Sequence, residues 1–99
     1  MDFKVIWSDS AIADPEEICG YISRRNPAAA GRVGEDILER VDLLAAFPYL
    51  GPRCPTGSES YVRGLVCGNY RVFYQVNSQT KQVAILRVWH GRRGEPPQL

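Results

Sequence analysis

Residues 68–90, GNYRVFYQVNSQTKQVAILRVWH, decide the fold because they contain two apolar β-runs joined by a polar pentapeptide. In the first run, side chains alternate between two faces as they do in a half-buried strand. One face carries Tyr70, Val72, Tyr74 and Val76, and the other carries Arg71 and Gln75. Residues 77–81 have turn-favouring composition, and residues 82–89 are rich in β-branched and apolar side chains. The stretch therefore predicts a β-hairpin with Arg71 pointing away from the core.

A second hairpin precedes this one and shares its first strand. Residues 61–67, YVRGLVC, are short and apolar, and Gly68-Asn69 is a two-residue link suited to a primed turn. Such a turn fixes the register of the two strands. It pairs Cys67 with Tyr70, Leu65 with Val72 and Arg63 with Tyr74, and it places Val66 opposite Arg71. We expect a three-stranded antiparallel meander.

The N-terminal part of the chain predicts a strand and then a helix. Residues 3–7, FKVIW, must join the later sheet because a lone strand leaves its backbone groups unpaired, and we expect it at an edge. Asp14-Pro15-Glu16-Glu17 resembles a helix start with Asp14 as N-cap. A first helix is expected over about residues 15–25, with any helical turn before Pro15 kinked or broken.

A second helix is predicted from Asn26-Pro27 to Phe47-Pro48, because Asn caps helices and Pro suits their first turn. Its apolar stripe has three- and four-residue spacing and comprises Ala30, Val33, Ile37, Leu38, Val41, Leu44 and Ala45. Residues 48–60 predict a loop. The fold class is thus α+β: an N-terminal strand, an antiparallel helical hairpin and a three-stranded antiparallel meander, with the helices on one sheet face.

Length and composition limit the function classes. The 99 residues predict one domain, 1–99, with 91–99 as a basic, poorly ordered tail. No apolar run approaches the roughly 20 residues that a membrane span needs, and no signal peptide or nucleotide-binding motif is present. Cys19, Cys54 and Cys67 lack metal-ligand spacing and are expected to be buried thiols, which suits a reducing cytoplasm. We expect no metal, cofactor or membrane partner.

Formal charge is unevenly distributed along the chain. Residues 1–52 contain five Lys/Arg and nine Asp/Glu, whereas residues 53–99 contain seven and two. An acidic half and a basic half suit different partners.

Seven short motifs, in order, resemble those of ParE-type toxins. They are W-S-x-x-A at 7–11, I-x-x-Y-I at 18–22, N-P-x-A-A at 26–30, F-P-x-x-G at 47–51, R-x-L at 63–65, G-x-Y-R-V-x-Y at 68–74 and H-x-x-R at 90–93. The resemblance spans nearly the whole chain and implies the RelE/ParE superfamily. It implies a helical hairpin on an antiparallel sheet, and a cytoplasmic toxin that a cognate antitoxin neutralises in a type II toxin–antitoxin module of the kind associated with plasmid stabilisation. Pro15 departs from the family pattern, where a helix-favouring apolar residue is common.

The superfamily resemblance implies two possible targets. RelE-like members cleave messenger RNA on the ribosome, and here Arg71, His90 and Arg93 would be the catalytic candidates, with Arg63 or Arg92 assisting. The lysine pair of RelE has no counterpart in residues 61–65, and no tyrosine follows His90. ParE-like members are taken to poison DNA gyrase by binding it, and N-P-x-A-A and F-P-x-x-G favour that target. The leading prediction is therefore a gyrase poison without catalytic residues, which binds its target through Arg63, Arg71, Arg92 and Arg93.

Each candidate also has an ordinary structural role. Arg71 is compatible with a solvated strand arginine. Strict alternation puts His90 on the side of Leu86 and Val88, where a sheet-end histidine is more common than a general acid or base. An inactive interaction module would carry the same fold.

Overall fold

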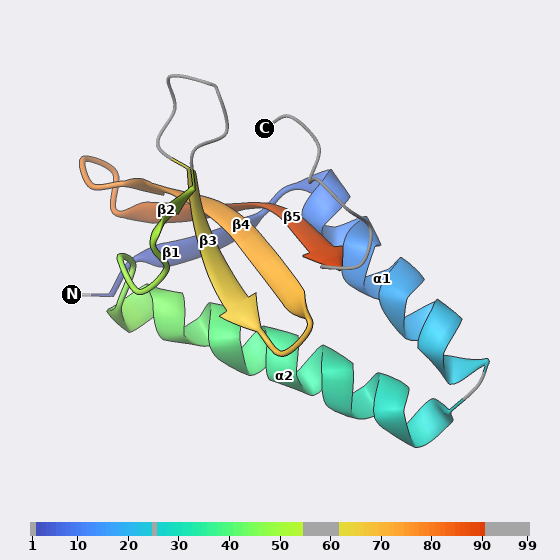
Figure 1. The fold of residues 1–99 in the computed structure, drawn as a ribbon. Helices are drawn as coiled ribbons and strands as arrows, with labels where there is room; N and C mark the ends of the chain where they lie inside the picture. Colours follow the sequence, from blue (N-terminus) through green and yellow to red (C-terminus); the bar gives the residue numbers. More distant parts are fainter. Residues whose placement is uncertain (1, 25, 55–61, 91–99) are drawn as a thin grey trace.

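The computed structural model describes residues 2–24, 26–54 and 62–90, and it confirms the α+β class (Figure 1). The elements follow the order β1 (Lys4–Trp7), α1 (Asp9–Ser23), α2 (Pro27–Ala46), β2 (Arg53–Cys54), β3 (Val62–Cys67), β4 (Tyr70–Asn77) and β5 (Gln82–His90). They form one sheet in the order β1-β5-β4-β3-β2, with β1 at an edge as expected and parallel to β5. The two-residue strand β2 was not predicted. The predicted tail 91–99 and residues 55–60 of the predicted loop lie outside the described residues.

The meander has the predicted register. Cys67 pairs with Tyr70, Leu65 with Val72, and Arg63 with Tyr74. Gly68 has a φ of 60°, the left-handed conformation that glycine adopts at no steric cost in a two-residue turn. These pairs confirm that alternate residues of β4 face the core, because Val72 and Tyr74 are fully buried while Arg71 is exposed.

A β-bulge in the β4–β5 ladder lets both halves of β5 face the core. Phe73 pairs with Arg87 and Tyr74 pairs with Ile85, so that Leu86 has no cross-strand partner in β4. The extra residue reverses the alternation of β5. Consequently Ile85 and Val88, which strict alternation would place on opposite faces, are both buried.

The predicted start of the first helix is wrong, because α1 begins at Asp9 and runs through Pro15. Ser8 is the N-cap, and its Oγ accepts a hydrogen bond from the Ala11 amide at 3.1 Å. Pro15 removes one helical hydrogen bond, but contacts with β5 hold the turns before it. The Ser8 amide donates to the Ile85 carbonyl at 3.0 Å, and Ala11 is completely buried. Tertiary packing therefore outweighs the local stop signal.

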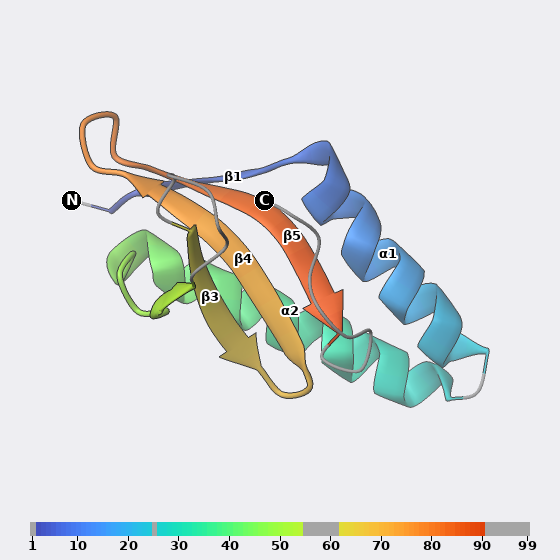
Figure 2. The ribbon, with the colours of Figure 1, turned by 45° about the horizontal axis from the view of Figure 1, so that its top comes forward.

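Helix α1 also covers the part of β5 that β1 does not reach (Figure 2). β1 pairs only with residues 82–85 of β5. Beyond that point the Ser8 hydroxyl donates to the Leu86 carbonyl at 2.9 Å, and the Val88 amide donates to Asp14 at 2.9 Å. Two polar groups on the edge of β5 are thereby satisfied by the N-cap of α1 and by a side chain within α1 rather than by another strand.

Helix α2 crosses the sheet face that carries Val72 and Tyr74 and supplies one wall of the core (Figure 1). Its start is as predicted, since Asn26 caps it and accepts from the Ala29 amide at 3.2 Å. The stripe is narrower than predicted: Leu38 is 56% exposed, because it projects from the flank of the helix rather than toward the sheet. The buried stripe residues are Ala30, Ile37, Val41 and Leu44. The last three pack in the main core with Val72, Tyr74, Val83, Ile85 and Val88.

Candidate functional site

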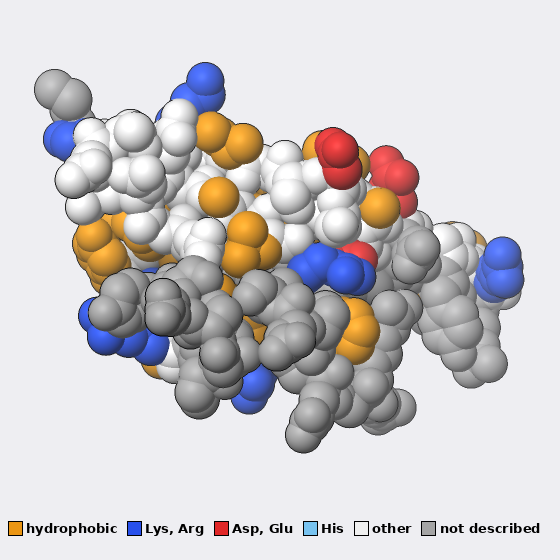
Figure 3. Space-filling view, turned by 90° about the horizontal axis from the view of Figure 1, so that it is seen from above, with side chains coloured by type: hydrophobic (Ala, Val, Ile, Leu, Met, Phe, Trp, Pro, Cys, Tyr) orange, Lys and Arg blue, Asp and Glu red, His pale blue; other side chains and the backbone are white. Residues whose placement is uncertain are grey.

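The predicted candidates divide between the two faces of the sheet. Arg71 lies on the face turned away from α2, where its cross-strand partner is Trp89. Its side chain is exposed, and it forms no hydrogen bond or ion pair with another described residue. Figure 3 looks toward this face and shows acidic side chains at the right, where Figure 1 places α1. Arg71 therefore carries its charge on the exposed side of the sheet.

His90 lies on the opposite face of the sheet from Arg71. Its cross-strand partner is Tyr70, and the two rings meet edge to face with centroids 4.9 Å apart and planes at 76°. Tyr70 in turn packs against the main core. His90 is half-buried on the same side as Val88, as alternation predicted. Adjacent cross-strand pairs thus place Arg71 and His90 on different sides of the sheet.

Arg63 is held by the turn that follows α2. Its Nη1 donates to the Gly51 carbonyl at 2.7 Å, and its guanidinium carbon lies 4.9 Å from the centroid of the Tyr49 ring. Through its register partner Tyr74, Arg63 faces the α2 side of the sheet, away from Arg71. Arg92 and Arg93 lie outside the described residues. Their predicted role in target binding, and that of Arg63, stay predictions.

The surroundings of Gly51 explain why the F-P-x-x-G motif ends in a glycine. The Gly51 amide donates to the Tyr74 hydroxyl at 2.8 Å, deep in the protein. A Cβ at this position would lie 2.9 Å from the Gly64 carbonyl oxygen and 3.0 Å from the Tyr74 hydroxyl. The turn can approach β3 and β4 this closely only because residue 51 has no side chain.

The sequence did not predict the ion pair between Asp14 and Arg87. Asp14 accepts from Arg87 Nε at 2.8 Å and from Arg87 Nη2 at 3.0 Å, in addition to the Val88 amide. The Arg87 guanidinium carbon also lies 5.6 Å from the centroid of the Trp89 ring. The sequence signal was misleading, because an Asp before a Pro is typical of an N-cap. Asp14 instead anchors α1 to the strand that carries Trp89.

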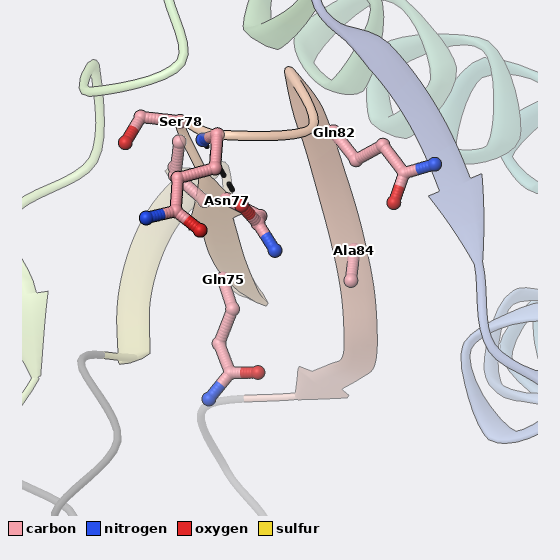
Figure 4. Close-up of a pocket in the computed structure, with 7 residues that line it drawn as sticks. Gln75, Asn77, Ser78, Gln82 and Ala84 are labelled. Carbon is pink, nitrogen blue, oxygen red and sulfur yellow. Dashed lines mark hydrogen bonds between the residues drawn. The ribbon is translucent and has the colours of Figure 1, made fainter.

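A shallow cavity of about 450 Å³ lies beside the turn between β4 and β5 (Figure 4). It is lined by Gln75, Val76, Asn77, Ser78, Gln79, Gln82 and Ala84. Asn77 Oδ1 accepts from the amides of Gln79 and Thr80 and so orders the turn. The lining contains no charged side chain, and none of the predicted site residues belongs to it.

The described residues offer little for metal or thiol chemistry. No group of three His, Cys, Asp or Glu side chains in this part of the chain is arranged to hold a metal ion. Cys67 is buried as predicted, and burial, together with the nearby Asp36 carboxylate, raises the pKa of its thiol against the opposing effect of Arg40. The side chains of Cys19 and Cys54 are not described. None of the described helices is long and apolar enough to cross a membrane.

Comparison with known proteins gives a family match and several similar folds. The model of the family described as "ParE toxin of type II toxin-antitoxin system, parDE" matches residues 5–94. No curated protein sequence gives a match.

Among solved structures, the chromosomal ParDE system from P. aeruginosa is 24% identical, covers 89% of this chain and 95% of that chain, and has a TM-score of 0.74. The archaeal RelE–RelB complex from Pyrococcus horikoshii OT3 is 21% identical, with coverage of 95% and 100% and a TM-score of 0.68. The RelBE2 toxin–antitoxin complex from Mycobacterium tuberculosis is 20% identical, with coverage of 91% and 99% and a TM-score of 0.66. These similarities show a shared fold.

Proposed function

Because this chain belongs to the ParE toxin family of type II toxin–antitoxin systems, we propose that it inhibits growth by binding and poisoning DNA gyrase in the cytoplasm. A cognate antitoxin neutralises it. The observation that carries the choice of gyrase over messenger RNA is the separation of Arg71 and His90 on opposite sheet faces.

RNA cleavage needs several groups around one phosphate. A base activates the 2′-hydroxyl, cations stabilise the charged intermediate, and an acid protonates the leaving oxygen. An arginine supplies charge but does not release its proton near neutral pH. The sequence contains one histidine, His90. Its ring packs against Tyr70 on the side of the sheet away from Arg71. This arrangement supports a toxin that binds its target rather than one that cleaves it.

We place the gyrase contact on the open sheet face around Arg71. Arg92 and Arg93, which follow β5 closely in the sequence, are proposed to extend the contact. Arg63 faces the other side of the sheet. A partner that touches both Arg63 and Arg71 would have to pass around the edge formed by β3 and the short strand β2.

The test compares the native protein, Arg71→Ala and His90→Ala in two purified assays. One measures supercoiling and DNA cleavage by gyrase, and the other measures cleavage of ribosome-bound message. Arg71→Ala should weaken gyrase inhibition, whereas His90→Ala should retain it provided that its melting temperature shows a folded protein. Loss of message cleavage in a folded His90→Ala variant, by the roughly 10²- to 10⁴-fold of a proton-transfer residue, would instead establish the RelE-like nuclease.

A further inference from the structure

Arg71 and Trp89 form a cross-strand pair on the sheet face that is turned away from α2. The Arg71 side chain is exposed, and the Trp89 side chain is half-buried with its indole Nε1 inside the protein. Side chains directly opposite each other on antiparallel strands have Cβ atoms about 4.5–5.5 Å apart. A partner that contacts the Arg71 guanidinium therefore lies within reach of the indole ring.

The indole ring is held by Arg87, two residues before it on β5. The Arg87 guanidinium carbon lies 5.6 Å from the centroid of the Trp89 ring, which is within the range of a cation–π contact. Residues two positions apart on a strand share a face, so this contact lies on the same side of the sheet as Arg71. Arg87 thus limits the orientations that the Trp89 ring can adopt.

Arg87 is in turn fixed by helix α1, which lies beside β5 (Figure 2). The Asp14 carboxylate is 6% exposed and accepts from Arg87 Nε at 2.8 Å and from Nη2 at 3.0 Å. Such a bidentate pair fixes the plane of the guanidinium as well as its position. Asp14 also accepts from the Val88 amide, which ties it to the backbone of β5. A chain of contacts therefore runs from α1 through Asp14 and Arg87 to the Trp89 ring.

We propose that Trp89, beside Arg71, is a contact residue for gyrase and that Arg87 positions its ring. This inference rests on the proposed function, which supplies gyrase as the partner. Because Asp14 neutralises Arg87, the contact takes its charge from Arg71 and its apolar area from Trp89. The pair fits a segment of gyrase with a carboxylate next to an apolar side chain. Tryptophan and arginine often dominate the energy of protein interfaces, and a ring that is already oriented loses less entropy on binding.

The experiment measures inhibition of gyrase supercoiling by the full-length native chain and by three variants: Trp89→Ala, Arg87→Lys and the two combined. Arg87→Lys keeps a positive charge for Asp14 but presents no planar guanidinium to the ring. Matched controls are Phe47→Ala and Arg32→Lys, which change exposed side chains at the end of α2 and within it. Urea unfolding checks that each variant is folded under the assay conditions.

We expect Trp89→Ala to raise the toxin concentration for half-inhibition about 10- to 30-fold, as for an interface anchor, and Arg87→Lys to raise it about 3- to 10-fold. Because Arg87 acts through the Trp89 ring, adding Arg87→Lys to Trp89→Ala should change inhibition by less than about twofold. A purely structural role of Arg87 would weaken inhibition equally with and without the indole ring. The two controls should stay within about twofold of native.

The outcomes separate this inference from the proposed function. If the native chain does not inhibit gyrase, the proposed function is wrong and this inference fails with it. If the native chain inhibits gyrase and folded Trp89→Ala inhibits equally well, Trp89 is not a contact residue while the proposed function stands. Equal losses from Arg87→Lys in the native and Trp89→Ala backgrounds would refute the positioning role. Binding of the native chain to plasmid without gyrase, lost in Trp89→Ala, would show that the ring meets DNA and not gyrase.

Discussion

Replacing Asp14 with Ala tests the anchoring of α1 to β5. The carboxylate is 6% exposed and accepts three hydrogen bonds, two from Arg87 and one from the Val88 amide. Its loss leaves the Val88 amide without this acceptor and removes the carboxylate that binds the Arg87 guanidinium. Breaking a buried ion pair costs about 3–5 kcal/mol, and since the Arg87 side chain is 28% exposed we expect about 2–4 kcal/mol here.

Urea unfolding measures this loss, with Glu16→Ala as the matched control because Glu16 is an exposed carboxylate on the same helix. The control should stay within about 0.5 kcal/mol of native. In a domain of this size the Asp14→Ala melting temperature should fall by about 10–25 °C. An Asp14→Ala variant as stable as Glu16→Ala would show that Asp14 does not hold the helix through Pro15.

Three further predictions follow from the packing and the burial. Gly51→Ala should cost about 1–3 kcal/mol in free energy of unfolding, because its Cβ would lie 2.9 Å from the Gly64 carbonyl oxygen; an unchanged melting temperature would contradict the tight turn. Leu44→Ala and Ile37→Ala should each cost about 2–5 kcal/mol by urea unfolding, whereas exposed Leu38→Ala should cost under about 0.5 kcal/mol; equal effects would mean that the helix phase is wrong. Cys67 should be alkylated slowly at neutral pH in the native state and quickly in urea, because its raised pKa and its burial both reduce accessible thiolate; site-resolved mass spectrometry showing rapid native labelling of Cys67 would refute this.

The meander was predictable because its information is local. Alternation in residues 70–76 and the Gly68-Asn69 link set which side chains face the core and which residues pair. The same alternation turned Arg71 away from the core and placed His90 on the side of Val88, and the structure agrees with both. The bulge at Leu86 was not predictable, but residues 82–89 were already apolar enough to indicate a strand.

The remaining features depend on residues far apart in the chain. Asp14 resembled an N-cap, and only its contact with Arg87, 73 positions away, shows that it lies inside α1. The two residues of β2 stand among Pro and Gly and are paired only because the Gly51 turn packs on β3. Leu38 shares the helical period of the stripe, although the width of the stripe depends on how α2 lies on the sheet. The hydrogen bond from Arg63 to the Gly51 carbonyl could not be predicted, because Gly51 belongs to a turn with no regular sequence pattern.

The central claim is that the chain binds gyrase without cutting RNA. The most direct measurement adds the purified native protein to gyrase and supercoiled plasmid, in parallel with translating ribosomes on a defined message. We predict that cleaved plasmid accumulates or supercoiling stops in proportion to the toxin, that the cognate antitoxin reverses the effect, and that the message stays intact. Intact gyrase activity at saturating toxin, together with position-specific cleavage of the message, would contradict the claim.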